Sequence, residues 1–504
     1  MGKRGLHIAL LLSLSESIFA VASDDALSRV VENERMNVVP ELGAENPAMM
    51  KDRYAKTLTE IEAGWVFGDE NQPKIMQEGD GENRMSAVVD AFVKNGKNDI
   101  WGNAGYSIGQ RRNVAFNETS DYRMLYPYVT ADLVGGDLHE EIYRFEGGFA
   151  HRVSSSVVLG AQAGYRALLA YRSVDPRPRN LTGDLDFAAG ISWTKNEHTF
   201  GAALKVSKYK QTNDVEFYSE TGHPTVYHAT GLGTDYYRFR GSNTDTYYNG
   251  RGFGGVVNHV CVRGATAVSF NAVYDYFGFD KIISSLNELP MASVGEHRFS
   301  AALTGLFRQK QNRDIFVEAG YEYVRRNGTE NIFGDAQNNI YPEIASLPMY
   351  RRSAHDAHVK LSYDNRLNPV GFRLSAVAGY HDENVRYVSP ERLLAVQAPY
   401  AGIQASTTYR KKRWLLRGEA QVEMMIGPNG SFAMPSERNS VLDEAAKRVY
   451  EVISETQTSM SAALRADYAA GKRFAVFLRL RWAGELYAGG GRANHAETAV
   501  GLLF

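Results

Sequence analysis

Long hydrophobic runs are missing from this 504-residue chain: after residue 22, no stretch reaches the roughly 20 apolar residues that a membrane-spanning helix needs. Cysteine is almost absent, and the single Cys261 excludes an intramolecular disulfide framework and a cysteine metal cluster. Neither sign of charge is in excess, because 56 Lys and Arg stand against 58 Asp and Glu, interspersed through the chain. We therefore expect no nucleic-acid partner, no metal and no cofactor.

The N-terminus has the three parts of a secretory signal peptide. Lys3 and Arg4 precede an apolar run over residues 8–14, and Ala20-Val21-Ala22 offers small residues for cleavage. The pattern predicts a signal peptide over residues 1–22 and export through the inner membrane. An uncleaved helical anchor is the alternative, but the apolar run is too short for it. Any later membrane crossing must be made by strands.

Apolar and polar residues alternate through most of the chain. In residues 474–482, apolar side chains occupy every even position, while Arg479 and Arg481 fall on odd ones. Successive side chains of a strand point to opposite faces, so the segment has one apolar and one polar face. The same period recurs at residues 184–193, 315–324, 356–364, 414–426 and 459–468.

Segment length separates the two folds that accept such alternation. A soluble antiparallel sheet has one core face and one wet face, whereas a membrane barrel meets lipid outside and a polar lumen inside. Sandwich strands average about five or six residues, while a tilted membrane strand needs about 9 to 11. Most of the alternating segments have about ten residues, which favours the barrel.

Short and long connections also alternate, as in barrels with short periplasmic turns and long extracellular loops. Short joints are predicted at residues 94–98, 152–155, 195–198, 262–265, 309–313, 366–370, 410–413 and 470–472. The longest connections cover residues 211–247, 327–352 and 427–455, and residues 124–134 are assigned to another external loop.

The prediction is an all-β protein: a transmembrane antiparallel β-barrel of about 18 strands, within a range of 14 to 18, in the bacterial outer membrane. The barrel covers residues 57–504, with a first strand near 57–67. Residues 23–56 are expected in the periplasm or the lumen.

The faces of the strands follow from the alternation. The predicted lipid-facing residues are Trp193, Trp414, Phe474, Val476, Leu478, Leu480 and Trp482. The predicted lumen-facing charged residues are Arg308, Glu318, Glu322, His358, Lys360, Asp364, Arg373, Arg417, Glu419, Arg465, Asp467, Arg479 and Arg481. We expect Leu478→Arg to impair assembly and Arg479→Gln to be tolerated. Such a lumen can be a water-filled pore or a closed interior cross-linked by ion pairs, and the alternation does not decide between them.

Two loop segments suggest further roles. Residues 218–248 are rich in tyrosine, and Tyr227, Tyr236, Tyr237, Tyr247 and Tyr248 could recognise proteins or glycans. The alternative is that these rings continue the strands above the membrane. Residues 441–453 have apolar side chains at helical spacing, which predicts a short helix packed on the barrel rim or serving as a lid.

Catalysis is not expected. The best local group of candidate catalytic residues is His355, Asp356, His358, His381 and Asp382, which an outer-membrane lipase or protease could use as a remote alternative. No nucleophile elbow or metal-binding signature accompanies them.

The last residues resemble the C-terminal signal that bacterial outer-membrane barrels present to their assembly machinery. Val500, Leu502 and the final Phe504 carry the resemblance, which implies that machinery as a partner.

Residues 126–138 and 175–180 resemble an uncharacterised family of Bacteroidota-type outer-membrane barrels. Asn46-Pro47-Ala48 is similar to the motif near the start of fatty-acid-channel-like barrels. The family resemblance implies a setting among outer-membrane uptake systems, with a TonB-dependent transporter or a surface lipoprotein as possible partners, and it implies no catalytic residues.

We therefore expect a porin-like channel or a subunit of a nutrient-uptake assembly, surrounded by outer-membrane lipid. The alternative is a closed barrel that serves as a scaffold and binds partners through its extracellular loops. The solute, the oligomeric state and the state of the lumen do not follow from the sequence.

Overall fold

The structure is a computed structural model that describes residues 26–36, 41–220, 222–241, 245–310, 312–338, 340–366, 369–435 and 442–504. The predicted signal peptide, residues 1–22, lies outside the described residues. Within the described ranges, no helix is long and apolar enough to cross a membrane.

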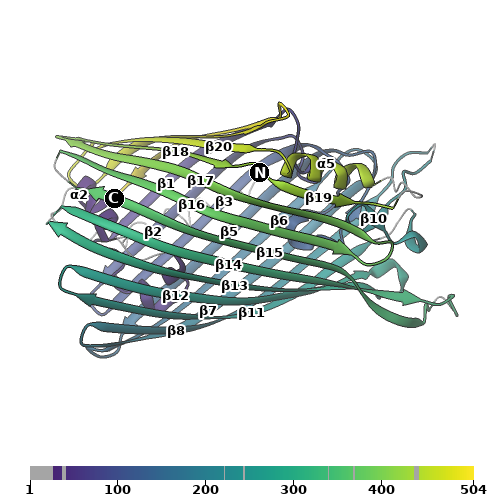
Figure 1. Ribbon diagram of the computed structural model, residues 1–504, viewed down its shortest axis with the longest axis horizontal. Helices are drawn as coiled ribbons and strands as arrows, with labels where there is room; N and C mark the ends of the chain where they lie inside the picture. Colours follow the sequence, from purple (N-terminus) through teal and green to yellow (C-terminus); the bar gives the residue numbers. More distant parts are fainter. Residues whose placement is uncertain are drawn as a thin grey trace, which may run out of the picture.

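One antiparallel sheet closes into a barrel of 18 wall strands (Figure 1), which confirms the predicted fold and strand number. Each wall strand pairs with its neighbours in chain order, and β19 continues β18 along β17. The wall strands are β1 (Leu58–Glu70), β2 (Gly81–Asn95), β3 (Asn98–Val114), β5 (Gly136–Arg152), β6 (Val157–Tyr171), β7 (Arg177–Lys195), β8 (His198–Glu216), β11 (Thr246–Arg263), β12 (Thr266–Ile283), β13 (Leu289–Lys310), β14 (Arg313–Phe333), β15 (Glu343–Asn365), β16 (Val370–Tyr387), β17 (Arg392–Lys411), β18 (Trp414–Met425) with β19 (Asn429–Ala433), β20 (Gln457–Tyr468), β21 (Ala475–Tyr487) and β22 (Arg492–Leu503).

The barrel closes between its first and last strands. β1 pairs with β22 from Glu60 opposite Leu503 to Glu70 opposite Ala493. Phe504 extends this pairing, because Phe504 and Thr59 exchange two backbone hydrogen bonds of 2.8 and 2.9 Å.

On the inner side, ion pairs cross the closing strands. Arg465 of β20 donates both terminal nitrogens to the carboxylate of Glu60 at 2.7 Å. Arg479 of β21 bonds Glu62 at 2.8 Å and Glu497 at 2.7 Å. The seam is therefore fastened by backbone pairing and by half-buried ion pairs.

The two ends of the barrel differ in their connections. Short joints, together with the start of β1 and the end of β22, lie at one end, which we call the turn end; the opposite, loop end carries the long connections. All eight predicted short joints fall between consecutive wall strands. At four of them a positive φ begins a two-residue turn, at Gly96 (57°), Asn196 (54°), Gly264 (60°) and Lys412 (54°), which suits the twist of a hairpin.

The predicted loop over residues 327–352 is mostly strand, so that expectation is wrong. β14 runs to Phe333 and β15 begins at Glu343. These strands have 21 and 23 residues, far more than the about 9 to 11 that cross a bilayer. Their ends project past the apolar band, where the outer face meets water and the inner face is buried by connections that fold into the lumen, and a polar sequence there looks like a loop.

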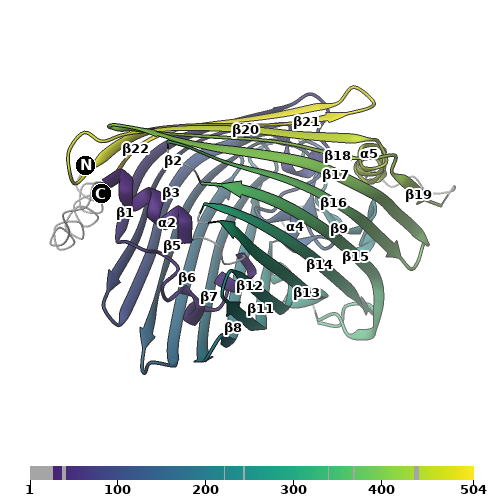
Figure 2. The same ribbon diagram turned by 60° about the vertical axis from the view of Figure 1, so that its left-hand side comes forward.

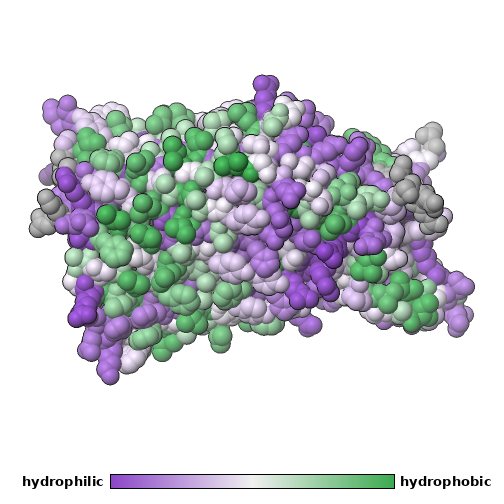
Figure 3. Space-filling model, in the orientation of Figure 1, coloured by the Kyte–Doolittle hydropathy of each residue, from purple (hydrophilic) through white to green (hydrophobic). Residues whose placement is uncertain are grey.

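On the face that Figure 3 shows, hydrophobic residues gather over the half nearer the turn end and hydrophilic residues are more frequent toward the loop end. The exposed apolar side chains of each strand recur at every second position, as with Val476, Leu478 and Leu480 on β21. Between them Phe477 is buried and Arg479 is half-buried against acidic partners. The observed alternation is that of a wall with an apolar outside and a polar inside.

The N-terminal segment lies inside the turn end. Helix α2 (Ala26–Met36) sits within the ring of strands (Figure 2). Its buried residues Ala26, Leu27 and Val30 pack on a cluster that includes Phe477 and Leu503 of the wall. The short helices α3 (Glu41–Ala44) and η1 (Pro47–Met50) follow. The lumenal position, one of the two expected for residues 23–56, is thus the one adopted by the described part.

Asn46 and Pro47 pack this segment against glycines of the barrel wall. Asn46 donates to Oδ1 of Asn258 at 2.9 Å and accepts from the Ala48 amide at 3.0 Å. A Cβ at Gly160 would lie 2.3 Å from the Pro47 carbonyl carbon. Only glycine lets the two backbones approach so closely.

Further elements occupy the loop end. The connections 115–135 and 217–245 enclose a small three-stranded sheet, and we call them the inner loops. They contain α4 (Tyr122–Leu125), β4 (Thr130–Ala131), β9 (Tyr227–Gly231), β10 (Thr234–Asp235) and η3 (Tyr237–Phe239). Residues 124–134 are therefore not part of the barrel wall, and they fold into the lumen where an external loop was expected. The remaining helices are η2 (Met76–Glu78), η4 (Ser284–Leu286) and α5 (Asp443–Ile453), which confirms the helix predicted at 441–453.

Candidate functional site: a lumenal passage

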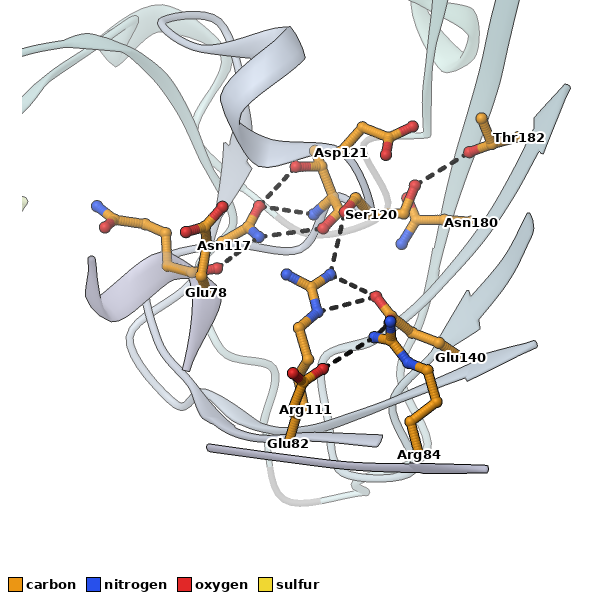
Figure 4. Close-up of polar contacts among 12 residues, drawn as sticks. Glu78, Glu82, Arg84, Arg111, Asn117, Ser120, Asp121, Glu140, Asn180 and Thr182 are labelled. Carbon is orange, nitrogen blue, oxygen red and sulfur yellow. Dashed lines mark hydrogen bonds and ion pairs between the residues drawn. The ribbon is translucent and has the colours of Figure 1, made fainter. Parts of the chain in front are cut away.

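The inner loops are fixed to one side of the lumen by charged groups. Arg111 lies between Glu140 and the backbone carbonyl of Ser120 (Figure 4), donating to them at 2.8 and 3.0 Å. Glu140 also accepts from Arg84 at 2.8 Å. Asp121 forms a bidentate pair with Arg166 at 2.8 and 2.9 Å. Bidentate pairs fix geometry as well as charge, so the first inner loop is held on β3, β5 and β6.

Buried polar groups lie beneath the same loop. Arg172 donates to Asp132 at 2.7 Å, and both side chains are fully buried. Neither carboxylate oxygen of Glu118 has a hydrogen-bond partner among the described residues. Burial, helped by the negative charge of Asp132, raises the pKa of Glu118 to about 8. Burial also lowers the pKa of His228 in β9 well below its ordinary value. Burial thus favours the neutral forms of Glu118 and His228, whose side chains are usually charged or titrate near neutral pH.

The opposite side of the lumen contains three cavities. The turn-end cavity has a volume of about 890 Å3 and is lined by α2 and by strands from β15 to β21. The middle cavity of about 560 Å3 adjoins it, because Gln404 and Ser406 on β17 line one cavity each. The loop-end cavity of about 530 Å3 shares Lys74, His381, Met425 and Gln457 with the middle one. We call this row of cavities along β14 to β21 the lumenal passage.

The turn-end cavity is rich in arginine, but most of the charges are paired. Arg417 donates to Asp467 at 2.9 Å and Arg373 to Asp364 at 3.1 Å. Arg481 is the freest of the predicted group, with 54% of its side chain exposed and one contact of 3.4 Å to Glu497. The lining is therefore polar, with eight basic and three acidic side chains, and further carboxylates of the wall pair with several of the arginines.

The middle cavity gathers part of the predicted histidine group. Asp356 lies 3.7 Å from His358 and 3.5 Å from His381, and it accepts a 2.8 Å hydrogen bond from Tyr400. His355, by contrast, points outward with Tyr321, whose hydroxyl is 2.9 Å away. Successive side chains of a strand point to opposite faces, so His355 lies outside although its neighbour Asp356 lies inside. By the same alternation, Asp382 faces outward like Tyr380.

The divided group does not make a catalytic arrangement. No nucleophile lies beside the inward histidines in the contacts described, and no three metal-binding side chains of the described ranges converge on one point. The inward members instead add polar lining to the passage.

The loop-end cavity has an apolar wall and a charged wall. Ala445, Ala446, Val449 and Ile453 of α5 contribute to the apolar side. On the charged side, Arg326 donates to Glu296 at 2.7 Å and Arg352 pairs with Glu383. The helix thus covers this end of the passage.

All thirteen residues predicted for the lumen lie on the inward parity of their strands. Most are paired, for example Lys360 with Gln404 at 3.2 Å and Glu318 with His358 at 3.6 Å. The seven residues predicted to face lipid are between 38% and 47% exposed, on the outward parity. Contact with lipid itself stays a prediction.

The tyrosines predicted for recognition are divided by burial. Tyr227 and Tyr248 are buried in the core beneath the inner loops, so their rings are not available to a partner in this conformation. Tyr237 is 77% exposed and Tyr247 is partly exposed. The buried aromatic residues of the inner loops pack on apolar side chains of the barrel such as Phe279 and Ile283.

Several residues of the passage were not found by sequence reasoning. Lys74, Gln77 and Tyr350 line the loop-end cavity, yet they come from connections and strand ends without a motif. Strand parity places Tyr350, Arg326 and Arg352 inward. Nothing local indicates that the connection holding Lys74 bends into the lumen.

Comparison with known proteins finds one matching family, and solved structures that share the fold at low sequence identity. A family described as "Family of unknown function (DUF6850)" matches residues 47–504. No curated protein matches the chain.

Solved structures with the same kind of fold include three receptors or transporters. BauA, the ferric preacinetobactin receptor from Acinetobacter baumannii, has 8% identity and a TM-score of 0.40, over 88% of this chain and 80% of that chain. The ferric enterobactin receptor PfeA from Pseudomonas aeruginosa has 7% identity and a TM-score of 0.40, over 89% and 82%. The copper transporter OprC has 8% identity and a TM-score of 0.41, over 88% and 81%. Similarity this low transfers neither a substrate nor a mechanism.

Proposed function

We propose that this chain, which belongs to the DUF6850 family of unknown function, forms a solute channel across the bacterial outer membrane, alone or within a nutrient-uptake assembly. One observation carries the proposal: three cavities follow one another along β14 to β21, and each has polar or charged side chains in its lining. A purely structural barrel would have no need for such a row of cavities.

The hydrophobic outer face supports a location in the outer membrane. The hydrophobic part of the wall (Figure 3) would be covered by outer-membrane lipid, with the turn end in the periplasm and the loop end outside the cell. The proposal also includes a signal peptide at residues 1–22. It further includes recognition of Val500, Leu502 and Phe504 by the assembly machinery. A Bacteroidota-type origin and a TonB-dependent transporter or surface lipoprotein as partner stay predictions.

Two elements are placed to limit passage. Ser28, Val31 and Glu32 of α2 line the turn-end cavity, so the N-terminal segment narrows the periplasmic exit. At the other end α5 is held to the wall by the Arg392–Asp443 ion pair and by stacking of Phe432 on Tyr450. We propose that solutes enter beside α5 and leave beside α2.

Ion conductance of the purified full chain in a planar lipid bilayer tests the channel. Gln421 on β18 lines the middle cavity, and the next residue, Val422, points outward. Gln421→Trp is expected to reduce the single-channel conductance, because the larger ring fills part of the passage, whereas Val422→Trp leaves it unchanged. A folded wild-type barrel that passes no current would overturn the channel and favour the closed scaffold.

A further inference from the structure

The loop-end cavity has the dimensions of a small-molecule site. Its volume of about 530 Å3 lies within the range of roughly 300 to 1,000 Å3 that such sites have. Apolar side chains of α5, of the inner loops and of β16 and β17 form one wall, including Val129, Leu232 and Leu394. These apolar side chains would bury the apolar body of a ligand.

Positive charge exceeds negative charge in the lining. Five basic side chains, Lys74, Arg123, Arg298, Arg326 and Arg352, face two acidic ones, Glu296 and Glu383. Arg123 has a further partner in Glu78, at 2.6 Å. The lining and its immediate partners therefore keep an excess of cations.

Lys74 contributes most to this excess. No carboxylate of the described ranges lies within ion-pairing distance of its ammonium, whose one contact is Oε1 of Gln457 at 3.5 Å. Burial lowers the pKa of Lys74, which an anion beside it would offset. The side chain stands where the loop-end and middle cavities join.

Two buried polar atoms in the same lining have no hydrogen-bond partner within the described part of the chain. They are the hydroxyl of Tyr350, a residue 2% exposed, and Oε1 of Gln77, a residue 8% exposed. Buried polar groups are normally satisfied, and one that is not commonly marks a missing ligand or water. A hydroxyl can donate to an anionic oxygen, and an amide oxygen can accept from a donor group.

We propose that the loop-end cavity binds a small amphipathic anion, with its apolar body against α5 and its acidic group near Lys74. This inference rests on the proposed channel and names the class of solute that the channel admits. Tyr350 adds a donor, and the unpaired Gln77 oxygen suits a hydroxyl or amide of the ligand.

Three probes with one apolar body and different charge test the proposal: 4-phenylbutyrate, 4-phenylbutanol and 4-phenylbutylamine. Their affinities are measured by calorimetry on the full chain in lipid nanodiscs, with empty nanodiscs subtracted. The wild type is expected to bind the carboxylate about tenfold more tightly than the alcohol, and the amine least. Lys74→Gln is expected to remove this preference while the affinity for the alcohol changes less than about twofold.

Two variants on α5 separate the cavity from the rest of the surface. Ala446→Trp fills the cavity and is expected to abolish binding of both the carboxylate and the alcohol. Lys447→Gln, on the exposed side of the same helix, leaves both unchanged. Should Ala446→Trp not fold, Ala446→Leu provides a smaller filling with a partial loss.

Equal affinity for all three probes, or no binding by wild-type protein that conducts ions, would overturn the anion site and leave the channel standing. Retention of the carboxylate preference in Lys74→Gln would likewise overturn the assigned role of Lys74. Conversely, probe binding by a barrel that passes no current would support the site and overturn the channel. The two proposals therefore fail separately.

Discussion

Leu478→Arg is expected to destabilise the folded barrel by about 2 to 4 kcal/mol, the cost of an arginine on the lipid face at the bilayer centre. Leu478 is 44% exposed on the outer face, midway between Phe474 and Trp482. With a rise of about 3.4 Å per residue and a tilt of about 40°, these two aromatic residues are about 21 Å apart along the barrel axis. That distance nearly spans an apolar band of about 25 Å, so position 478 lies close to its middle.

The expected loss corresponds to a factor of about 30 to 900 in the folding equilibrium. Urea titration in lipid vesicles, with the folded fraction read from the heat-dependent gel mobility of the barrel, measures the free energy of unfolding. Ala483→Arg is the matched control, because Ala483 is exposed on the lumenal parity of the same strand. Equal free energies of unfolding for the two variants would refute the assignment of the faces.

Three further predictions concern buried contacts. Arg479→Gln is expected to lower the free energy of unfolding by about 1.5 to 3 kcal/mol for each charge-assisted bond lost, whereas Arg481→Gln, with a longer contact of 3.4 Å, changes it by less than about 0.5 kcal/mol in the same titration. Gly160→Ala is expected to raise hydrogen exchange of residues 46–53, because its Cβ would meet Pro47 at 2.3 Å; Gly164→Ala, with no atom nearer than 3.9 Å, should not. Burial raises the pKa of Glu118 from 4.5 to about 8, so the folded loop keeps a proton that the unfolded loop releases, and its stability falls as the pH rises from about 4.5 to 8. Glu118→Gln should remove this fall in hydrogen-exchange protection of residues 115–135, and an unchanged pH dependence would exclude Glu118 as its cause.

The barrel follows from local rules, and the sequence therefore predicts it well. A period of two, a strand length set by the bilayer and an even strand number leave few alternatives to 18 strands. The alternation is lost where no bilayer surrounds the strands. Beyond the bilayer neither face of β14 or β15 needs to be apolar, so residues 327–333 and 343–352 do not look like strands.

The contents of the lumen depend on contacts that no local pattern encodes. Parity places Arg479 inside, but its two carboxylate partners come from β1 and β22, and only the structure shows that removing it would take this ion pair from Glu62 and leave Glu497 with the longer contact to Arg481. The expectation that Arg479→Gln is tolerated is revised for this reason. Similarly, Asp121 of an inner loop meets Arg166 of β6 through the curvature of the wall.

The fastening of the seam limits how a molecule inside the barrel can leave. To part β1 from β22, the wall would have to lose its backbone pairing and also expose Glu60 and Glu62 without Arg465 and Arg479. Separating such pairs toward hydrocarbon is far more costly than moving a loop in water. Sideways discharge into the bilayer is therefore disfavoured at this junction, and transport through the proposed channel is expected to run along the barrel axis.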